Sequence, residues 1–247
     1  MWTYPRVIAH RGGGTLAPEN TLAAMQCGLD HGYHAVEFDV MLSKDGVPVL
    51  MHDPLFGRTV REPGGAVAAT LAKDLFQMDA GSWFSSKYEG VRVPSYAEVL
   101  QFCRQHDIWM NVEIKPVPGY EQDTGRVVAL VTQQLLAAGD TMPLFSSFSF
   151  DALMSAKAQA PEIARAYLLD QITADWRTSL QELEAVALHT NQKNLSAAKA
   201  REVKQAGYGL FCYTVNTPER ATELRQWGVD AFCTDRIDLI AADFYGD

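Results

Sequence analysis

Short apolar runs alternate with helix-like segments along most of this chain of 247 residues, and this alternation limits the fold more than any other feature. Strands that alternate with helices form parallel sheets with helical crossovers. If residues 47–51 are the return arm of a hairpin, eight strands remain and can close a (β/α)8 barrel of the TIM type. An open, doubly wound sheet is the alternative. The predicted strands are residues 6–10, 35–40, 47–51, 110–115, 144–148, 165–169, 185–189, 209–215 and 231–235.

Helix signals between these strands support the alternation. Residues 96–106 follow a capping box, in which Ser95 and Glu98 can each satisfy a backbone amide of the other. Residues 219–227 follow Thr217, which is a preferred residue at a helix start. Two further helices are predicted at residues 151–160 and 197–206.

Residues 54–93 break the alternation, because they show no clear period and contain scattered glycines and aromatic residues. A segment of this length without clear structure is usually a functional insertion. It follows His52 directly, so we expect it to rise from the same end of the barrel. The alternative is a surface excursion whose aromatic side chains form their own small core. We therefore predict one barrel domain over residues 1–247, with an insertion at about 54–93.

The charge of the chain limits its partners. The 30 acidic residues outnumber the 21 Lys and Arg residues, which gives a formal net charge of −9. This balance argues against nucleic acid as a partner and against a basic patch for anionic membranes. An anionic substrate must then meet a local positive site.

The sequence also predicts a cytoplasmic location. No basic stretch is followed by an apolar leader segment, and no apolar run is long enough to span a membrane. The cysteines form no CxxC pair and fit the free thiols of a reducing compartment. They are Cys27, Cys103, Cys212 and Cys233.

Two carboxylates lie two residues apart in the strand predicted at 35–40. Side chains of a strand alternate between its faces, so Glu37 and Asp39 share one face. Two like charges repel unless a proton or a cation lies between them. Hard metal ions prefer such oxygen ligands. The alternative is an exposed strand whose acids face water.

Other polar residues end neighbouring strands. His10 and Arg11 follow the first strand, His52 ends the hairpin arm, and Glu113 and Lys115 end the strand at 110–115. Barrel enzymes place their chemistry at the C-terminal ends of the strands. Separate structural roles would not explain why all these residues fall at the same end. The sequence therefore predicts a charged site at this rim.

The residue types at this rim favour phosphoryl chemistry. Three carboxylates with water suit Mg²⁺ or Ca²⁺, whereas the two histidines leave zinc as an alternative. A hard cation beside an Arg and a Lys suits a phosphoryl group. One histidine can remove a proton from the attacking hydroxyl, while the other protonates the leaving alkoxide. A phosphodiester is the natural substrate for this set.

The motifs AHRG, APENT, EFDV, SKDG, VLMHD, VEIK, SSF and TVN occur in this order between residues 9 and 235. Together they resemble the glycerophosphodiester phosphodiesterases, above all the short bacterial cytoplasmic enzymes that serve glycerol-phosphate uptake. The resemblance implies a TIM-type barrel with a small insertion after the second strand. It also implies hydrolysis of small glycerophosphodiesters to an alcohol and sn-glycerol 3-phosphate, with a divalent cation.

The resemblance also implies roles for single residues. Phe148 and Trp83 are predicted to form apolar walls for the substrate, and Asn216 is predicted to contact it. Glu19 is interpreted either as a partner that positions Arg11 or as a favourable charge at a helix start. The remaining implied roles are an acid–base pair of His10 and His52, metal ligands Glu37, Asp39 and Glu113, and a phosphate site of Arg11 and Lys115.

Several alternatives stay open. The substrate could be a lysolipid cleaved in the manner of phospholipase D or C, or the barrel could bind metal and phosphate without catalysis. The glycerol hydroxyl next to the diester could attack phosphorus internally and form a cyclic phosphate, or water could attack directly. His189, which ends a predicted strand, is interpreted as structural together with His31, His34 and His106.

Overall fold

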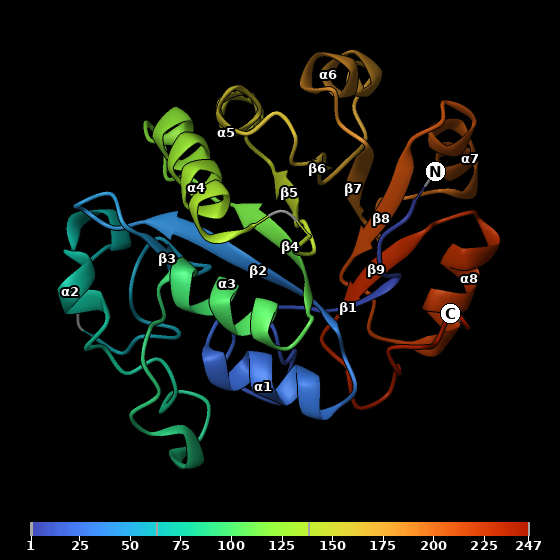
Figure 1. Ribbon diagram of the computed structural model, residues 1–247. Helices are drawn as coiled ribbons and strands as arrows, with labels where there is room; N and C mark the ends of the chain where they lie inside the picture. Colours follow the sequence, from blue (N-terminus) through green and yellow to red (C-terminus); the bar gives the residue numbers. More distant parts are fainter. Residues whose placement is uncertain (1, 63, 138, 247) are drawn as a thin grey trace.

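The computed structural model describes residues 2–62, 64–137 and 139–246, and within them eight parallel strands close into a barrel (Figure 1). β1 pairs with β2 through Ala9 and Val36, and with β9 through Val7 and Phe232, which closes the ring. The predicted TIM-type barrel is therefore confirmed. Its strands are β1 (Val7–Ala9), β2 (Ala35–Leu42), β4 (Trp109–Ile114), β5 (Leu144–Ser147), β6 (Arg165–Leu169), β7 (Ala187–Asn191), β8 (Gly209–Tyr213) and β9 (Ala231–Thr234).

The strand predicted at 47–51 is the return arm of a hairpin, as expected. It is β3 (Pro48–Leu50), which pairs antiparallel with β2 from Val40 to Leu42. This extra pairing explains why β2 continues beyond the predicted boundary at residue 40. His52 follows β3 and so returns to the barrel rim beside β2.

Helices lie around the outside of the barrel and join successive strands (Figure 1). The predicted capping box is present, because Ser95 Oγ accepts from the amide of Glu98 and the Glu98 side chain accepts from the amide of Ser95. Thr217 caps the last of them through the amide of Arg220. They are α1 (Leu22–Asp30), α3 (Tyr96–Gln105), α4 (Glu121–Leu135), α5 (Phe150–Gln159), α6 (Trp176–Leu183), α7 (Ala197–Gln205) and α8 (Pro218–Gln226).

Other predicted strand boundaries are also wrong, by one or two residues. The strand predicted from residue 185 begins at Ala187, because the amide of Ala185 still binds the Leu180 carbonyl at the end of α6. The strand predicted to reach residue 215 ends at Tyr213.

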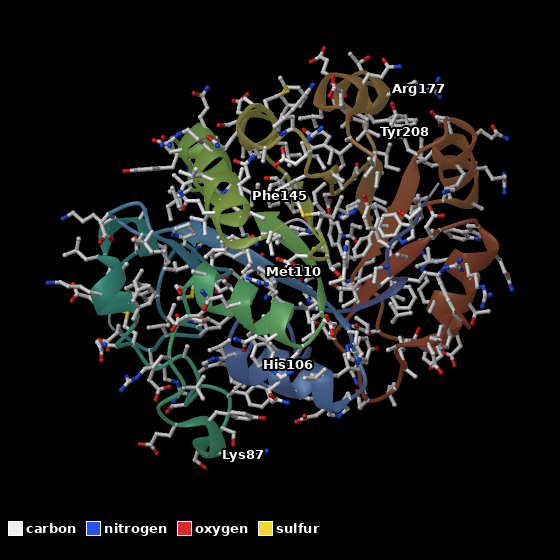
Figure 2. All side chains as sticks on the ribbon, in the orientation of Figure 1. Lys87, His106, Met110, Phe145, Arg177 and Tyr208 are labelled. Atoms are coloured by element: carbon white, nitrogen blue, oxygen red, sulfur yellow. The ribbon has the colours of Figure 1, made fainter. Side chains whose placement is uncertain are left out.

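Two apolar layers build the barrel. One lies between strands and helices, where Met110 and Phe145 are labelled in Figure 2. The other fills the barrel interior, and Trp2 and Tyr4 pack against it. This second layer plugs the barrel and leaves its C-terminal end to polar residues. Its buried members are Ile8, Ala35, Trp109, Leu144, Ala166, Ala187, Phe211, Ala231 and Cys233.

The described part of segment 54–93 folds beside the hairpin of β2 and β3. It contains η1 (Val67–Ala69), α2 (Ala72–Leu75) and η2 (Ser86–Tyr88). Its small core combines apolar residues of the segment with Met41 and Val49 of the hairpin. Elsewhere in the segment, Asp79 accepts hydrogen bonds from the amides of Gly81, Ser82 and Gly90. The segment therefore has a small core of its own, which it shares with the hairpin of β2 and β3 and against which Phe56 and Phe76 pack.

Among the helices in the described residues, none is both long and apolar enough to cross a lipid bilayer.

Candidate active site

Three carboxylates of the described chain meet at the barrel rim. Glu37 and Asp39 come from β2, and Glu113 of β4 pairs in register with Asp39. One oxygen from each lies within 4.8 Å of the other two. Parallel pairing of β2 with β4 thus turns two separate sequence motifs into one acidic cluster, as the strand alternation predicted.

The surroundings give these carboxyl groups different acidities. Burial raises the pKa of Glu113 to about 8, and the nearby charge of Asp39 adds to the rise. Burial also raises the pKa of Glu37. Burial alone would raise the pKa of Asp39 too, but the positive charges of Lys115 and Arg11 hold it far below its usual value. Burial and neighbouring like charge thus disfavour the ionised forms of Glu37 and Glu113 unless a further cation is present.

Two basic side chains approach the cluster. Lys115 Nζ lies 3.0 Å from Asp39 Oδ1, and Arg11 Nε lies 3.5 Å from Asp39 Oδ2. Arg11 has a positive φ of 50° and also donates from Nη1 to Glu19 Oε1 at 2.8 Å. Of the two interpretations of Glu19, the structure therefore favours the one in which it positions Arg11.

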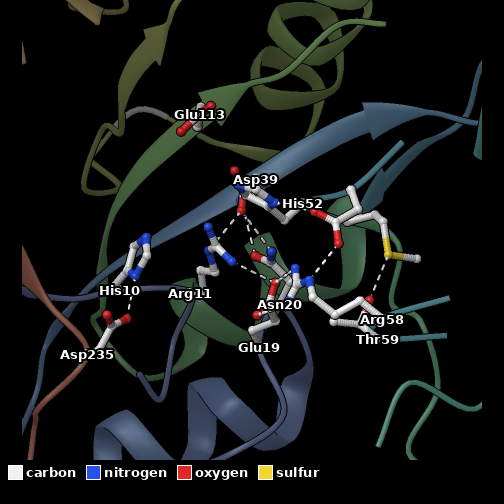
Figure 3. Close-up of polar contacts among 12 residues, drawn as sticks. His10, Arg11, Glu19, Asn20, Asp39, His52, Arg58, Thr59, Glu113 and Asp235 are labelled. Carbon is white, nitrogen blue, oxygen red and sulfur yellow. Dashed lines mark hydrogen bonds and ion pairs between the residues drawn. The ribbon is translucent and has the colours of Figure 1, made fainter. Parts of the chain in front are cut away.

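His10 is held by an acid from the far end of the chain. Its Nδ1 lies 2.6 Å from Asp235 Oδ1 (Figure 3). This contact leaves Nε2 directed toward Glu37 Oε2, which is 3.7 Å away. Burial alone would lower the pKa of His10, but the hydrogen bond with Asp235 and the charge of Glu37 outweigh it and raise the pKa. Asp235 is itself fixed by Asn216, whose Nδ2 donates to Asp235 Oδ2 at 2.9 Å.

His52 has a similar partner from its own loop. Its Nδ1 lies 2.7 Å from Asp53 Oδ1, and Arg58 Nε donates to the other oxygen of Asp53 at 2.6 Å. Burial lowers the pKa of His52, and the positive charges of Arg11 and Lys115 lower it further against the opposing charge of Asp39. In both histidines, Nδ1 thus contacts a carboxylate that fixes the orientation of the ring.

Arg58 connects the insertion to the site. Its Nη1 and Nη2 atoms each donate to Glu19, at 2.7 Å, in a bidentate pair. Through Glu19 and Asp53, this one guanidinium contacts the partners of both Arg11 and His52 (Figure 3).

These residues surround a cavity of about 190 Å³ that opens at the barrel mouth. The acids and bases line it together with neutral and aromatic side chains. The lining residues are His10, Arg11, Glu37, His52, Asn111, Glu113, Lys115, Ser146, Phe148, Leu168, His189, Phe211, Tyr213, Thr214 and Cys233.

The predicted substrate contacts lie in different places. Phe148 lines the cavity mouth, where its ring meets that of Tyr213 edge to face at 5.9 Å. Asn216 holds Asp235 and lines a neighbouring polar groove. Trp83 lies in the insertion beneath the guanidinium of Arg58, and among the described residues it is outside the cavity lining.

Sequence reasoning missed several members of the site. Asp235 ends the strand predicted at 231–235, and the strand-end rule that identified His52 applied to it equally. Asp53 directly follows His52 in the chain. Arg58 carried no such signal, because only the folded insertion brings it to Glu19. Asn20 also supports the cluster, because its Nδ2 donates to Asp39 Oδ2 at 2.8 Å, whereas the next residue, Thr21, caps α1.

Residues 10–239 match the model of the glycerophosphoryl diester phosphodiesterase family. The chain belongs to this family. It is 31% identical to a glycerophosphodiester phosphodiesterase of Caldanaerobacter subterraneus, with 93% of each chain covered. It is 30% identical to a putative glycerophosphodiester phosphodiesterase, YhdW, of Bacillus subtilis, covering 96% of this chain and 97% of that one.

A solved structure extends the comparison. A phosphodiesterase of Oleispira antarctica, in complex with the product sn-glycerol-3-phosphate, has a TM-score of 0.90 and 38% identity to this chain. The match covers 94% of this chain and 93% of that one. The resemblance seen in the motifs is confirmed. This member of the family is a phosphoric diester hydrolase that acts on glycerophosphodiesters.

Proposed function

We propose that the enzyme cleaves small glycerophosphodiesters to an alcohol and sn-glycerol 3-phosphate, using a divalent cation and two histidines. The observation that carries this proposal is that His10 and His52 line one cavity with Glu37 and Glu113, which form a carboxylate cluster with Asp39. The Oleispira relative, which binds sn-glycerol-3-phosphate, supports the same product here.

The acidic cluster fits a hard cation. Glu113 Oε1 is buried and accepts no hydrogen bond from any residue that the structure describes, and Lys115 Nζ lies 3.6 Å away. Glu37 and Asp39 add two more carboxylates at close range. Oxygen donors of this kind bind Mg²⁺ or Ca²⁺, and the cluster itself contains no Cys or His. A bound cation would polarise the phosphoryl oxygen and stabilise the negative charge that develops in the transition state.

The remaining residues position the diester. Arg11 and Lys115 place two positive charges beside the cluster, where they can bind phosphoryl oxygens. His10 and His52 then divide the proton transfers. One accepts the proton of the attacking hydroxyl, and the other protonates the leaving alkoxide through Nε2. Asp235 and Asp53 fix both rings so that Nε2 is the reactive atom.

The attacking hydroxyl is proposed to be that of the glycerol group next to the diester. Its oxygen forms a bond to phosphorus as the bond to the alcohol oxygen breaks, which yields the alcohol and a cyclic glycerol phosphate. Water then opens the ring to glycerol 3-phosphate. A diester without this hydroxyl is expected to react poorly, and undiminished turnover of that compound would instead favour direct attack by water.

The proposal is tested by assaying release of glycerol 3-phosphate from glycerophosphocholine with Mg²⁺, with Ca²⁺ and with chelator. A His10→Ala protein is the matched catalytic variant. We expect activity that requires the cation and that falls at least about 100-fold in the variant. Release from lysophosphatidylcholine but not from glycerophosphocholine would favour the lysolipid alternative, and no turnover of either would favour a binding protein.

A further inference from the structure

The inner part of the cavity is lined by neutral polar side chains. Barrels of this type usually fill their interior with bulky branched residues. Here Asn111 and Ser146 lie in register with Glu37 and Glu113 on the neighbouring strands, and both line the cavity. His189 of β7 lines it as well and stacks on Phe211 of the apolar plug, with ring centroids 4.3 Å apart. These positions place polar groups at the closed end.

Several polar atoms at this closed end have no partner. Asn111 Oδ1, Ser146 Oγ and both ring nitrogens of His189 are buried, and no described residue forms a hydrogen bond with them. The three residues are 2%, 1% and 0% exposed. Buried polar groups are nearly always paired in native proteins, so a set of them facing one cavity indicates a bound polar group.

The chemistry of the set selects hydroxyl groups. Burial lowers the pKa of His189 to about 3, so its ring is neutral and offers one donor and one acceptor. The Ser146 hydroxyl can donate and accept, and Asn111 Oδ1 accepts. None of the three carries a charge that could neutralise a phosphate or a quaternary ammonium. A hydroxyl, which donates and accepts at one atom, matches all of them.

We propose that Asn111, Ser146 and His189 form a subsite for the terminal hydroxyl of the glycerol group. This inference rests on the proposed function, which places the phosphoryl group among the charged residues of the rim. The alcohol group then leaves past Phe148 and Tyr213 at the mouth, so the glycerol group extends inward. Its hydroxyl next to the diester stays near phosphorus, and its terminal hydroxyl reaches the neutral residues.

With this subsite, the enzyme would accept deacylated substrates and reject lysolipids. A lysolipid carries its acyl chain on that same terminal oxygen. Phe211 of the apolar plug closes the inner end of the cavity. The cavity can hold a glycerol group, but an acyl chain would have to displace the apolar plug.

The test compares glycerophosphocholine with 2-hydroxypropyl phosphocholine, which lacks only the terminal hydroxyl. In the wild-type enzyme we expect kcat/KM to fall about 10- to 100-fold for the second compound, because the subsite is then left unpaired. Ser146→Ala and His189→Leu are expected to reduce this preference several-fold, mainly by weakening turnover of glycerophosphocholine. The preference is the ratio of the two kcat/KM values within one protein, so a change in the chemical step that affects both compounds equally cancels.

Thr190→Val is the matched control. Thr190 is adjacent to His189 on β7, is fully buried, and also has a hydroxyl that lacks a partner among the described residues. Side chains alternate along a strand, so Thr190 faces away from the cavity and should leave the preference unchanged.

Equal turnover of both compounds by the wild-type enzyme would overturn the subsite while leaving the proposed function intact. A preference that persists in both Ser146→Ala and His189→Leu would overturn it too. Inactivity of the wild-type enzyme toward both compounds would instead reject the proposed function, and the subsite with it. If His189→Leu fails to fold, Ser146→Ala decides alone, since it removes a single oxygen.

Discussion

The carboxylate of Asp235 lies 2.6 Å from Nδ1 of His10, although the two residues are 225 positions apart in the chain. Closure of the barrel explains this contact, because β1 pairs directly with β9 and brings both strand ends to one place. Asn216 fixes the carboxylate by donating to its other oxygen and accepting from the Asp235 amide. The ring of His10 is therefore held in one orientation by residues from the far end of the chain.

Replacing Asp235 with Asn is expected to lower kcat by about 100- to 1,000-fold with little loss of stability, because the ring loses the carboxylate that fixes its tautomer. Steady-state kinetics on glycerophosphocholine measure the change. Asp238→Asn is the control, since Asp238 pairs with Arg236 at the surface outside the cavity lining of the described residues. If kcat of Asp235→Asn stayed as high as that of Asp238→Asn, His10 would need no such partner.

Replacing Arg58 with Ala is expected to lower kcat about 10-fold while KM changes little, because Asp53 and Glu19 lose the cation that orients them. Arg61→Ala is the control within the same insertion, since Arg61 donates to the backbone oxygen of Trp83 rather than to Asp53 or Glu19. The prediction fails if kcat is unchanged in Arg58→Ala, or if melting temperatures show that the variant has simply unfolded.

Adding Mg²⁺ or Ca²⁺ to chelator-treated enzyme is expected to raise the melting temperature as well as restore activity. The cation binds the folded carboxylate cluster and not the unfolded chain, so it adds stability by mass action, by about 2.7 kcal/mol at 100 times its dissociation constant. Calorimetry with and without metal measures the shift. Glu113→Gln should shrink it, whereas Glu98→Gln, in the capping box of α3, should not.

His189 is expected to make the fold sensitive to acid. Its pKa is about 3 in the folded state and about 6.5 when exposed, so the unfolded chain binds the proton more readily between these values. Stability is therefore fully present above pH 6.5 and decreases as the pH falls toward 3. The loss amounts to about 2 kcal/mol at pH 5.

Chemical denaturation of wild type and His189→Gln between pH 7.5 and pH 5 measures this effect. The variant should lose about 2 kcal/mol less than the wild type over that range. His34→Gln, at an exposed position, should behave as the wild type does. Identical pH dependence in all three proteins would show that His189 can take up a proton in the folded state.

The barrel and most of the residues at its rim could be predicted from local patterns in the amino-acid sequence. Alternating strand and helix patterns are local, and parallel strands with helical crossovers follow from them wherever they repeat. Glu37, Asp39 and Glu113 were predictable because strand periodicity and the strand-end rule place them on one face at one end. In the structure, one carboxylate oxygen of each residue lies within 4.8 Å of the other two, in agreement with that prediction.

The residues that support that rim could not be predicted in this way, because they depend on contacts between distant parts of the chain. The contact of Asp235 with His10 depends on ring closure, and that of Arg58 with Glu19 depends on how the insertion packs. The unpartnered polar groups of Asn111, Ser146 and His189 depend on which side chains meet inside the barrel. Local patterns encode the direction of a side chain along its own strand, whereas its partners across the barrel are set by closure and register.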